Sequence, residues 1–307
     1  MKAMILTGHG GPEMLHYGDM PDPVAGPGEI VVEVYAASIN GADPKVRRGN
    51  GSYKLAKLPH ILGRDFSGVV AAVGPGVSDL AVGDAVFGVL DQGIEGTYAE
   101  KLAIKAALVA KKPASLSHVE AAALGLISIT ALTGIEDVAQ LKPGQTIVIQ
   151  GGAGGVAGFA VQLAKHLGAR VIATASANNR DYVKSLGADE VIDYNKEDFT
   201  KIGPVCDVVY DTVGGADVRA RSYQVLKPGG KLVWIAPAPD APHRNDVATL
   251  KPDVKRDRAH LERMLELVAA GAVKPPAITR YKLTDAAEAH RVSEGRHLRG
   301  KLVLVVR

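Results

Sequence analysis

The amino-acid sequence predicts an α/β protein in which an all-β, barrel-like domain is joined to a doubly wound parallel sheet. From Met1 to about Lys112, short β-like runs are separated by glycine and proline turn signals. From about Ser117 to Ala270, β-like runs alternate with helical patterns, which predicts strand–helix–strand units. The tail, residues 271–307, returns to β-like runs and most simply rejoins the first domain. We therefore expect one domain made of residues 1–122 and 271–307, and a second made of residues 123–270.

The composition narrows the class of protein. Hydrophobic residues make up 47% of the 307 residues, a fraction that is normal for a folded chain. The formal charge is +3, and no basic run is interleaved with aromatic residues, so we expect no nucleic-acid partner. Cys206 is the only cysteine, which excludes an internal disulfide framework and a multi-cysteine zinc site.

Two features bear on the location of the protein. The N-terminus, MKAMILTGHG, is too short and polar for a signal sequence and instead predicts a first strand. No apolar run approaches the roughly 18 residues of a membrane span. We therefore expect a cytoplasmic protein without a membrane partner.

The strands of the second region can be placed from their apolar, β-branched runs. The candidates are residues 146–150, 170–174, 190–193, 207–211 and 231–235. Between the first two, Val156, Phe159, Ala160, Leu163 and Leu167 follow the spacing of a buried helix face, and Gly168 can end that helix. Leu261, Leu265 and Val268 predict a last helix in this region.

A glycine-rich segment, QGGAGGVAG, joins the first predicted strand to the first predicted helix. Free backbone N–H groups and the dipole at a helix start bind phosphate, and missing side chains let a pyrophosphate approach. The segment contains G-x-G-x-x-G/A, with alanine in the last place at Ala157. The predicted dinucleotide-binding backbone comprises Gly152, Ala153, Gly154, Gly155 and Val156.

The end of the second predicted strand bears on the choice of dinucleotide. NAD enzymes usually carry an acid here, on the ribose 2′-hydroxyl, but no acid lies between Ala173 and Asn179. Ser176, Asn178, Asn179 and Arg180 can instead donate to a 2′-phosphate, and arginine suits phosphate geometry. These residues favour NADPH. The alternative is a solvated loop in which Arg180 pairs with Asp181, the one acid that would allow NADH.

Further motifs in this order resemble a known family. They are AASINGADPKVRRG, LPHILGRDFSGVVAAVG, VGDAVFG, the glycine segment, LGADEVIDY, YDTVGG, LKPGGKLV and LRGKLVLVV. The chain resembles the zinc-free quinone oxidoreductases, the zeta-crystallin-like group of the medium-chain dehydrogenase/reductase superfamily. The resemblance implies a GroES-like β-barrel catalytic domain and a Rossmann NADP-binding domain.

The resemblance also implies that the superfamily's zinc ligands are replaced. Asn40 stands where the zinc alcohol dehydrogenases have a cysteine, and Arg64-Asp65 stand where they have a His-Glu pair. The lobe that binds structural zinc would follow Phe87 and is missing. We expect no metal site, and we expect Arg64 and Asp65 to form an ion pair in the vacated position.

The implied activity is an NADPH-dependent, zinc-independent reduction of quinones by hydride transfer. One alternative is the reduction of carbon–carbon double bonds in enones or enals. An alternative of another class is an NADPH-binding structural or partner-binding protein without turnover.

The candidate catalytic residues come from the same resemblance. Asn40 could orient the nicotinamide carboxamide or the substrate carbonyl, or act only as a turn or cap residue. Tyr53 could bond a quinone oxygen or pass a proton, or lie on the surface. Thr130 could meet the nicotinamide end, or bond back to its own helix.

The resemblance assigns further cofactor contacts. Tyr194 would pack on the adenine ribose and 2′-phosphate, Gly214 would let the backbone pass the nicotinamide ribose, and Ile235 would border the same cleft. Arg299 would reach the 2′-phosphate from the tail. The family often dimerises through an edge strand, which here matches ATLKPDVKRD; Pro252 within it cannot donate a ladder hydrogen bond. We nevertheless expect a homodimer.

Overall fold

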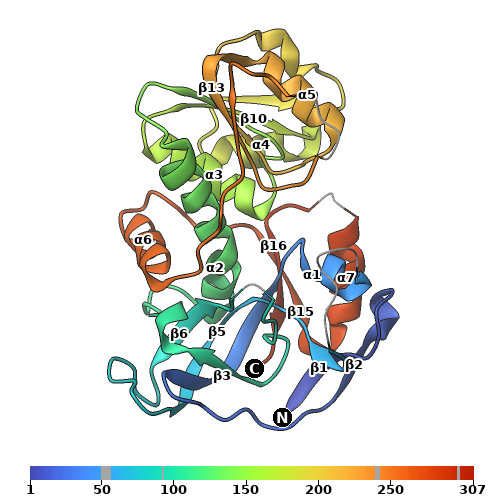
Figure 1. Ribbon diagram of the computed structural model, residues 1–307, viewed down its shortest axis with the longest axis vertical. Coiled ribbons are helices and arrows are strands. Elements are labelled where there is room, and N and C mark those ends of the chain that lie inside the picture. Colours follow the sequence, from blue (N-terminus) through green and yellow to red (C-terminus); the bar gives the residue numbers. More distant parts are fainter. Residues whose placement is uncertain (50–56, 92, 239–242, 296–297) are drawn as a thin grey trace. The chain divides into compact units, whose positions relative to one another are not determined.

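The computed structural model describes two compact units of the chain (Figure 1). The described residues are 1–49, 57–91, 93–238, 243–295 and 298–307. Unit 1 comprises Met1–Leu126, Arg256–Arg263 and Pro275–Arg307, and unit 2 comprises Ile127–Lys255 and Met264–Lys274. Compared with the expected domains, unit 1 extends four residues further into the first helix and also takes up residues 256–263.

Unit 1 is built on two sheets. The smaller sheet has the order β2-β1-β4, and the larger runs β15-β16-β3-β5-β6-β8, with β7 paired to β3. The strands are β1 (Lys2–Leu6), β2 (Leu15–Asp19), β3 (Glu29–Ile39), β4 (His60–Ile61), β5 (Asp65–Val73), β6 (Ala85–Val89), β7 (Lys101–Lys105), β8 (Val109–Lys111), β15 (Ile278–Lys282) and β16 (Lys301–Val305). Its helices include α1 (Asp43–Arg48) and α7 (Ala286–Glu294).

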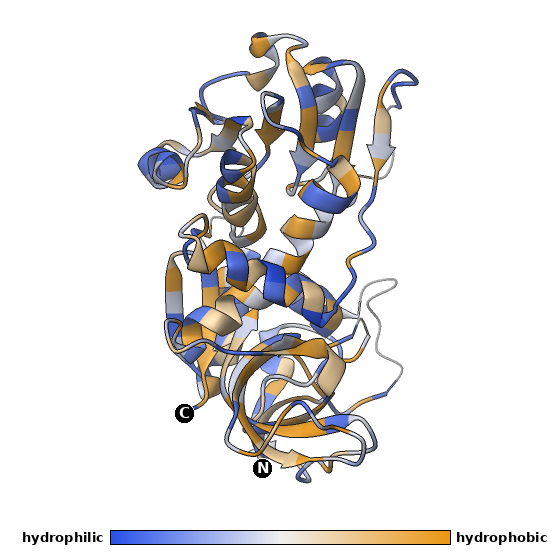
Figure 2. Ribbon diagram, turned by 90° about the vertical axis from the view of Figure 1, so that its left-hand side faces the viewer, coloured by the Kyte–Doolittle hydropathy of each residue, from blue (hydrophilic) through white to orange (hydrophobic). Residues whose placement is uncertain are grey.

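The tail of the chain joins the larger sheet of unit 1. Strand β16 pairs antiparallel with β3, so that Leu302 lies opposite Ile39. This pairing brings Lys301, at the start of β16, beside Asn40, which directly follows β3. Figure 2 shows the strands of this unit largely in the hydrophobic colour, and their buried side chains, such as Ile30, Phe66 and Leu304, form its core.

Unit 2 contains a six-stranded sheet of order β11-β10-β9-β12-β13-β14, and every pair in it is parallel. The strands are β9 (Thr146–Ile149), β10 (Arg170–Ala175), β11 (Glu190–Asp193), β12 (Cys206–Asp211), β13 (Leu226–Trp234) and β14 (Ala248–Leu250). The chain order reverses between β9 and β12. Ligands of such sheets bind outside the carboxyl ends of the strands at this point. The predicted doubly wound parallel sheet is confirmed, and β14 is an additional edge strand.

Several helices accompany this sheet besides the end of α2 (His118–Leu132). They are α3 (Gly155–His166), α4 (Arg180–Ser185), α5 (Ala216–Gln224) and α6 (Arg258–Ala269), the last of which is shared with unit 1. Helix α3 ends as predicted, because Gly168 has a φ of +78° that favours glycine. In α6 the buried face is formed by Leu261, Met264 and Leu267. Leu261 is buried as predicted, whereas the other two buried positions each precede a predicted one, Leu265 and Val268, by one residue.

One helical stretch contradicts the expectation that no apolar segment has the length of a membrane span. Helix α2 (His118–Leu132) continues into a π-helical segment, Thr133–Ala139. Together these 22 residues contain a window with a mean hydropathy of 1.5, of which 83% is buried inside the protein. Burial of this extent is typical of a helix in a protein core.

Candidate functional site: a glycine loop and a buried polar cluster

The glycine loop after β9 is built for close approach of the backbone. Gly151 has a φ of +74°, a conformation that favours glycine. A Cβ atom on Gly152 would lie 3.0 Å from both Ala173 Cβ and Val183 Cγ1, so the loop packs directly against β10 and α4. The absence of side chains therefore serves the packing of the loop as well as its exposed surface.

The start of α3 can accept a phosphate group. Gly154 precedes the helix with φ −73° and ψ 164°, and offers no side-chain cap. The first helical hydrogen bond runs from Gly158 N to Gly154 O at 2.7 Å. Backbone N–H groups before that bond point out of the helix start, where the dipole favours a negative charge. The residues present therefore fit the pyrophosphate of a dinucleotide.

Gln150 fixes the loop to both neighbouring strands. Its side-chain oxygen accepts a hydrogen bond from Thr174 Oγ1 at 2.8 Å, and Thr174 Oγ1 accepts one from Gly151 N at 3.0 Å. Its backbone oxygen accepts a hydrogen bond from Thr212 Oγ1 at 2.7 Å. The three carboxyl ends of β10, β9 and β12 are thus tied together around the glycine loop.

The predicted 2′-phosphate residues lie at the carboxyl end of β10. Ser176 follows this strand, and Asn179 Nδ2 donates to Ser176 Oγ at 3.2 Å. Arg180 pairs with Glu197 at 2.6 Å, which corrects the alternative in which it pairs with Asp181. Tyr194 follows β11 and is 46% exposed. Unit 2 therefore gathers these four residues at one edge of the sheet.

The nicotinamide end of the site is predicted at the loops that follow β12 and β13. Gly214 has a φ of +77°, and a Cβ atom there would lie 2.6 Å from Pro237 O. Ile235 donates its backbone N–H to Asp211 O at 3.0 Å, continuing the ladder beyond β13. The two loops therefore pack against each other at the carboxyl edge.

Thr130 lies in unit 2 near the end of α2. Its backbone oxygen accepts a hydrogen bond from the buried Tyr210 hydroxyl at 3.0 Å. A Cβ atom on Gly134 would lie 2.6 Å from Tyr210 Cε2, so the helix and β12 are in close contact. This contact fixes the part of the helix that carries Thr130 against the central strand.

Asp65 is the centre of a buried polar cluster in unit 1. One carboxylate oxygen accepts hydrogen bonds from Ser38 Oγ at 2.7 Å and from Asn40 Nδ2 at 2.8 Å. The other accepts one from Leu126 N at 3.0 Å. A buried carboxylate with three donors is well satisfied.

Lys301 completes this cluster from the tail. Its side chain is buried, and its ammonium donates to Asn40 Oδ1 and to Ile39 O, each at 2.7 Å. Burial lowers the pKa of Lys301, while Asp65 and Asp43 act in the opposite direction. Since Asn40 Nδ2 also donates weakly to Ser38 O at 3.4 Å, the amide of Asn40 is bonded on both sides within unit 1.

The structure places Arg64 differently from the prediction. Arg64 Nη2 donates to Glu95 at 3.2 Å, and Arg64 Nε lies 3.6 Å from Asp43. The expected Arg64–Asp65 ion pair is therefore wrong: Arg64 lies in the bend before β5, where its guanidinium faces Glu95 and Asp43. Asp43 also accepts hydrogen bonds from Asn40 N and from Tyr98 Oη, each at 2.8 Å.

A buried chain of polar groups leads away from Asp43. Tyr98 Oη lies 3.3 Å from His290 Nε2, and Arg47 Nη1 lies 3.2 Å from His290 Nδ1. Because arginine can only donate, Nδ1 accepts and Nε2 carries the proton. Burial, with a contribution from Arg47, lowers the pKa of His290 to about 3, so the ring is neutral. Arg47 also pairs with Glu294 at 2.6 Å.

The polar cluster of unit 1 does not fit a zinc ion. Among the residues that the structure describes, no group of three or more His, Cys, Asp or Glu side chains is arranged to hold a metal. The Asp65 oxygens are occupied by protein donors, and the Lys301 ammonium is bonded to Asn40 itself. A cation in this position opposes the binding of a dication.

The remaining predicted residues lie in unit 1. Arg299 is exposed just before β16. Tyr53 lies outside the described residues. The predicted set is therefore divided between the units: Asn40 and Arg299 belong to unit 1, whereas Thr130 and the residues of the glycine loop, the strand ends and the two loops belong to unit 2.

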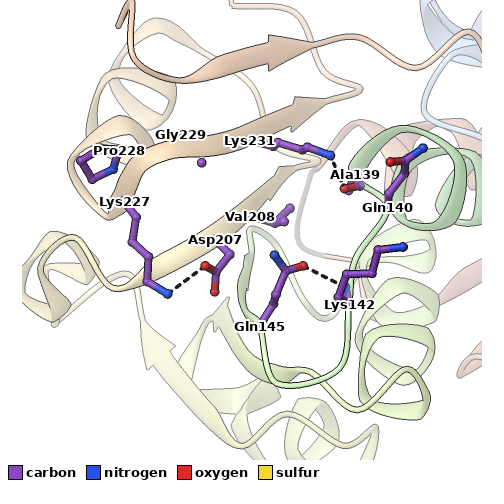
Figure 3. A pocket seen from close by; sticks show the side chains of 11 residues that line it. Ala139, Gln140, Lys142, Gln145, Asp207, Val208, Lys227, Pro228, Gly229 and Lys231 are labelled. Atoms are coloured by element: carbon purple, nitrogen blue, oxygen red, sulfur yellow. Dashed lines mark hydrogen bonds and ion pairs between the residues drawn. The ribbon is translucent and has the colours of Figure 1, made fainter.

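A separate pocket of about 290 Å³ lies at the opposite, amino edge of the sheet in unit 2 (Figure 3). Lys227 there pairs with Asp207 at 2.8 Å, and Lys231 donates to Ala139 O at 2.8 Å. These lysines serve the packing of the segments that line the pocket. The pocket is therefore distinct from the glycine loop, which follows the carboxyl end of β9.

Sequence reasoning missed two residues that the structure places at these sites. Lys301 directly precedes an apolar run, and only the pairing of β16 with β3 reveals its burial. Arg219 on α5 is the second, and its guanidinium contacts the loop after β13. Neither has a local sequence signal beyond a basic residue next to an apolar run.

Comparison with known proteins agrees with this architecture. Residues 26–114 match the model of the alcohol dehydrogenase GroES-like domain, and residues 186–304 match that of a zinc-binding dehydrogenase domain. The chain is 33% identical to the NADPH-dependent alkenal/one oxidoreductase, chloroplastic, of Arabidopsis thaliana, over 99% of this chain and 79% of the relative. It is 32% identical to the chloroplast envelope quinone oxidoreductase homolog of the same plant, over 96% and 95%.

Solved structures give the same result. The quinone oxidoreductase of Coxiella burnetii superposes with a TM-score of 0.91 at 34% identity, over 100% of this chain and 99% of that one. The Escherichia coli quinone oxidoreductase complexed with NADPH gives 0.91 at 30% identity, over the full length of both chains. The chain is an oxidoreductase of the medium-chain dehydrogenase/reductase superfamily and belongs with its quinone oxidoreductases.

Proposed function

We propose that this protein is an NADPH-dependent reductase that transfers hydride to quinones without zinc. The observation that carries this proposal is a buried protein cation, Lys301, bonded to Asn40, the residue that the resemblance places at a zinc-ligand position, alongside an intact dinucleotide loop. Without a Lewis acid, alcohol oxidation loses its activating group, whereas reduction of an activated acceptor needs mainly orientation.

The preference for NADPH is supported by the end of β10. Ser176 and Asn179 stand where an NAD-specific acid is usual, and Asn179 and Arg180 supply N–H donors. The nearest carboxylate partner of Arg180 is Glu197, and both side chains are largely open to solvent, so the ion pair contributes little and can open for a phosphate. An A. thaliana relative is named as NADPH-dependent, and an E. coli neighbour was solved with NADPH.

The candidate residues of unit 2 then have defined tasks. The bound cofactor supplies the hydride. The backbone of residues 152–156 would hold the pyrophosphate, and Ser176, Asn179, Arg180 and Tyr194 would hold the 2′-phosphate side. Gly214 and Ile235 would border the nicotinamide end, with Thr130 a further candidate there. The reduced quinone or enone takes up one proton to complete the reaction.

Enone or enal reduction is the second candidate, and the alkenal/one oxidoreductase relative favours it. The test is steady-state consumption of NADPH with a quinone and an enone as acceptors, repeated with NADH. We expect NADPH to be consumed several times faster than NADH, and the faster acceptor identifies the substrate class. Tight NADPH binding without consumption by any acceptor would contradict the reductase and favour a binding protein.

We also propose that the protein forms a homodimer through β14. This strand is the last in the sheet order of unit 2, and an edge strand can pair with a second copy. Pro252 lies beyond its last residue, Leu250, so the ladder positions of β14 itself keep their N–H groups. A monomeric mass in light scattering at working concentration would contradict this proposal.

A further inference from the structure

Arg219 holds the loop that follows β13 by its carbonyl groups. It lies on α5, and its side chain is 8% exposed. Nη2 donates to Ala236 O at 3.0 Å, and Nη1 donates to Ala238 O at 3.3 Å. The guanidinium also stacks on Trp234, with 4.4 Å between its carbon and the ring centroid. One side chain therefore fixes both the last residue of β13 and the loop behind it.

The same guanidinium faces the loop that follows β12. Arg219 Nη2 lies 3.9 Å from Asp211 Oδ2, and Asp211 is buried. The other oxygen of Asp211 accepts hydrogen bonds from Val213 N at 3.0 Å and from Gly214 N at 2.8 Å. The Asp211–Arg219 pair thus joins the two loops electrostatically, while each partner orders the backbone of one loop.

The two loops also touch each other and the glycine loop. Gly215 N donates to Pro237 O at 3.1 Å, and a Cβ atom on Gly214 would lie 2.6 Å from the same oxygen. A Cβ atom on Gly151 would lie 3.0 Å from Val213 Cγ2. Val213 itself is 52% exposed, so its apolar side chain is open to solvent beside the glycine loop.

We propose that Arg219 is a positioning residue that sets the wall of the nicotinamide half of the cofactor site. This inference rests on the proposed function. Arg219 acts through the loop of residues 235–238 and through Asp211, which orders Val213 and Gly214. The exposed Val213 side chain lies next to the glycine loop.

If Arg219 has this role, it affects the binding of the nicotinamide half of the cofactor and not that of the adenine half. The 2′-phosphate residues lie at the ends of β10 and β11, on the other side of β9 in the sheet order. Loss of Arg219 should therefore weaken NADPH, which carries the nicotinamide half. It should leave adenosine 2′,5′-bisphosphate, which carries only the adenine half, unaffected. A merely structural role would weaken both ligands.

The experiment measures the dissociation constants of both ligands by calorimetry, for the unaltered protein and for Arg219→Gln and Arg219→Lys. We expect Arg219→Gln to raise the dissociation constant of NADPH by about tenfold or more and that of the bisphosphate by less than about twofold. Arg219→Lys should fall between, because an ammonium keeps the charge but not the planar fork.

Arg221→Gln is the matched control. It lies on the same helix, and its partners are the exposed Asp198 and Asp217, so it should change neither constant. Trp234 is the only tryptophan in the chain, so its emission reports changes around the end of β13, including the loss of the stacked guanidinium itself.

Equal losses for the two ligands in both Arg219 variants, or unchanged NADPH binding with a shifted Trp234 emission, would overturn the inference while leaving the proposed function in place. If the unaltered protein bound neither ligand, the proposed function would fail together with it.

Discussion

Lys301 Nζ lies 2.7 Å from Asn40 Oδ1, although the two residues are 261 positions apart in the sequence. The contact fixes the orientation of the Asn40 amide, because its oxygen must face the ammonium and its nitrogen then faces Asp65 at 2.8 Å. A tail strand therefore determines the geometry of a residue that the resemblance places near the nicotinamide.

Replacement of Lys301 tests this relationship. In Lys301→Met, two buried oxygens, Asn40 Oδ1 and Ile39 O, lose their donor, and the Asp65 carboxylate loses a nearby positive charge. We expect the free energy of unfolding to fall by about 3–5 kcal/mol, as measured by urea denaturation. Lys105→Met is the control, since Lys105 is exposed and pairs with Asp91 at the surface, and it should cost less than about 1 kcal/mol. Equal effects of the two substitutions would contradict this account of Lys301.

His290 predicts a pH dependence of stability. Its pKa is lowered to about 3 from an ordinary value of 6.5. Because the unfolded chain binds a proton near pH 6.5 that the folded protein does not bind until about pH 3, stability is lost as the pH falls through this window. Between pH 7 and pH 5 this residue contributes a loss of about 2 kcal/mol.

His290→Gln keeps an acceptor for Arg47 and a donor for Tyr98 but cannot take up the proton. Urea denaturation at pH 7 and pH 5 should therefore show a smaller loss for the variant, by about 2 kcal/mol. The same pH dependence in both proteins would show that His290 is not buried in the neutral form.

Arg180 predicts the discrimination between cofactors. Only NADPH presents a 2′-phosphate, so Arg180→Ala should raise its dissociation constant by about tenfold and leave that of NADH nearly unchanged. Glu197→Gln should act in the opposite direction, because it releases Arg180 from its ion pair. Equal losses of NADPH and NADH affinity in Arg180→Ala would exclude Arg180 as the residue that reads the phosphate.

A side chain at Gly214 should destabilise the protein through close packing as well as through backbone conformation, and the two contributions can be separated. Gly214→Ala places a methyl group 2.6 Å from Pro237 O at a φ of +77°. Gly203 has a similar φ of +71° with nothing near its Cβ position, so Gly203→Ala reports the conformational cost alone. We expect Gly214→Ala to lower the melting temperature further than Gly203→Ala and to weaken NADPH binding. Similar melting temperatures for the two variants would show that the approach to Pro237 is not tight.

Features with a local origin could be predicted from the sequence. The glycine loop, the start and end of α3 and five of the six strands in unit 2 follow from turn residues and apolar periodicity within short windows. The short β14 was missed as a strand of its own, because three residues carry too little pattern. Strand β13 begins at Leu226, five residues before the predicted start at residue 231. In this added part its pairing with β12 is irregular, because the register shifts between Cys206 and Val208.

Features that depend on distant pairing could not be predicted. The Arg64–Asp65 ion pair was expected because these residues stand where the zinc enzymes have a ligand pair, whereas the partners of Arg64, Asp43 and Glu95, come from other segments. Lys301 and Arg219 are basic residues whose burial follows only from the arrangement of strands and loops around them. A charged residue that will be buried cannot be distinguished in the sequence from one that will lie at the surface.

The central claim is hydride transfer from NADPH without zinc. The most direct measurement is NADPH consumption with a quinone and with an enone, by protein dialysed against a chelator and assayed for bound zinc. The account predicts that consumption persists with far less than one zinc per chain and that added zinc does not raise it. Loss of consumption on dialysis, with recovery at one zinc per chain, would contradict it.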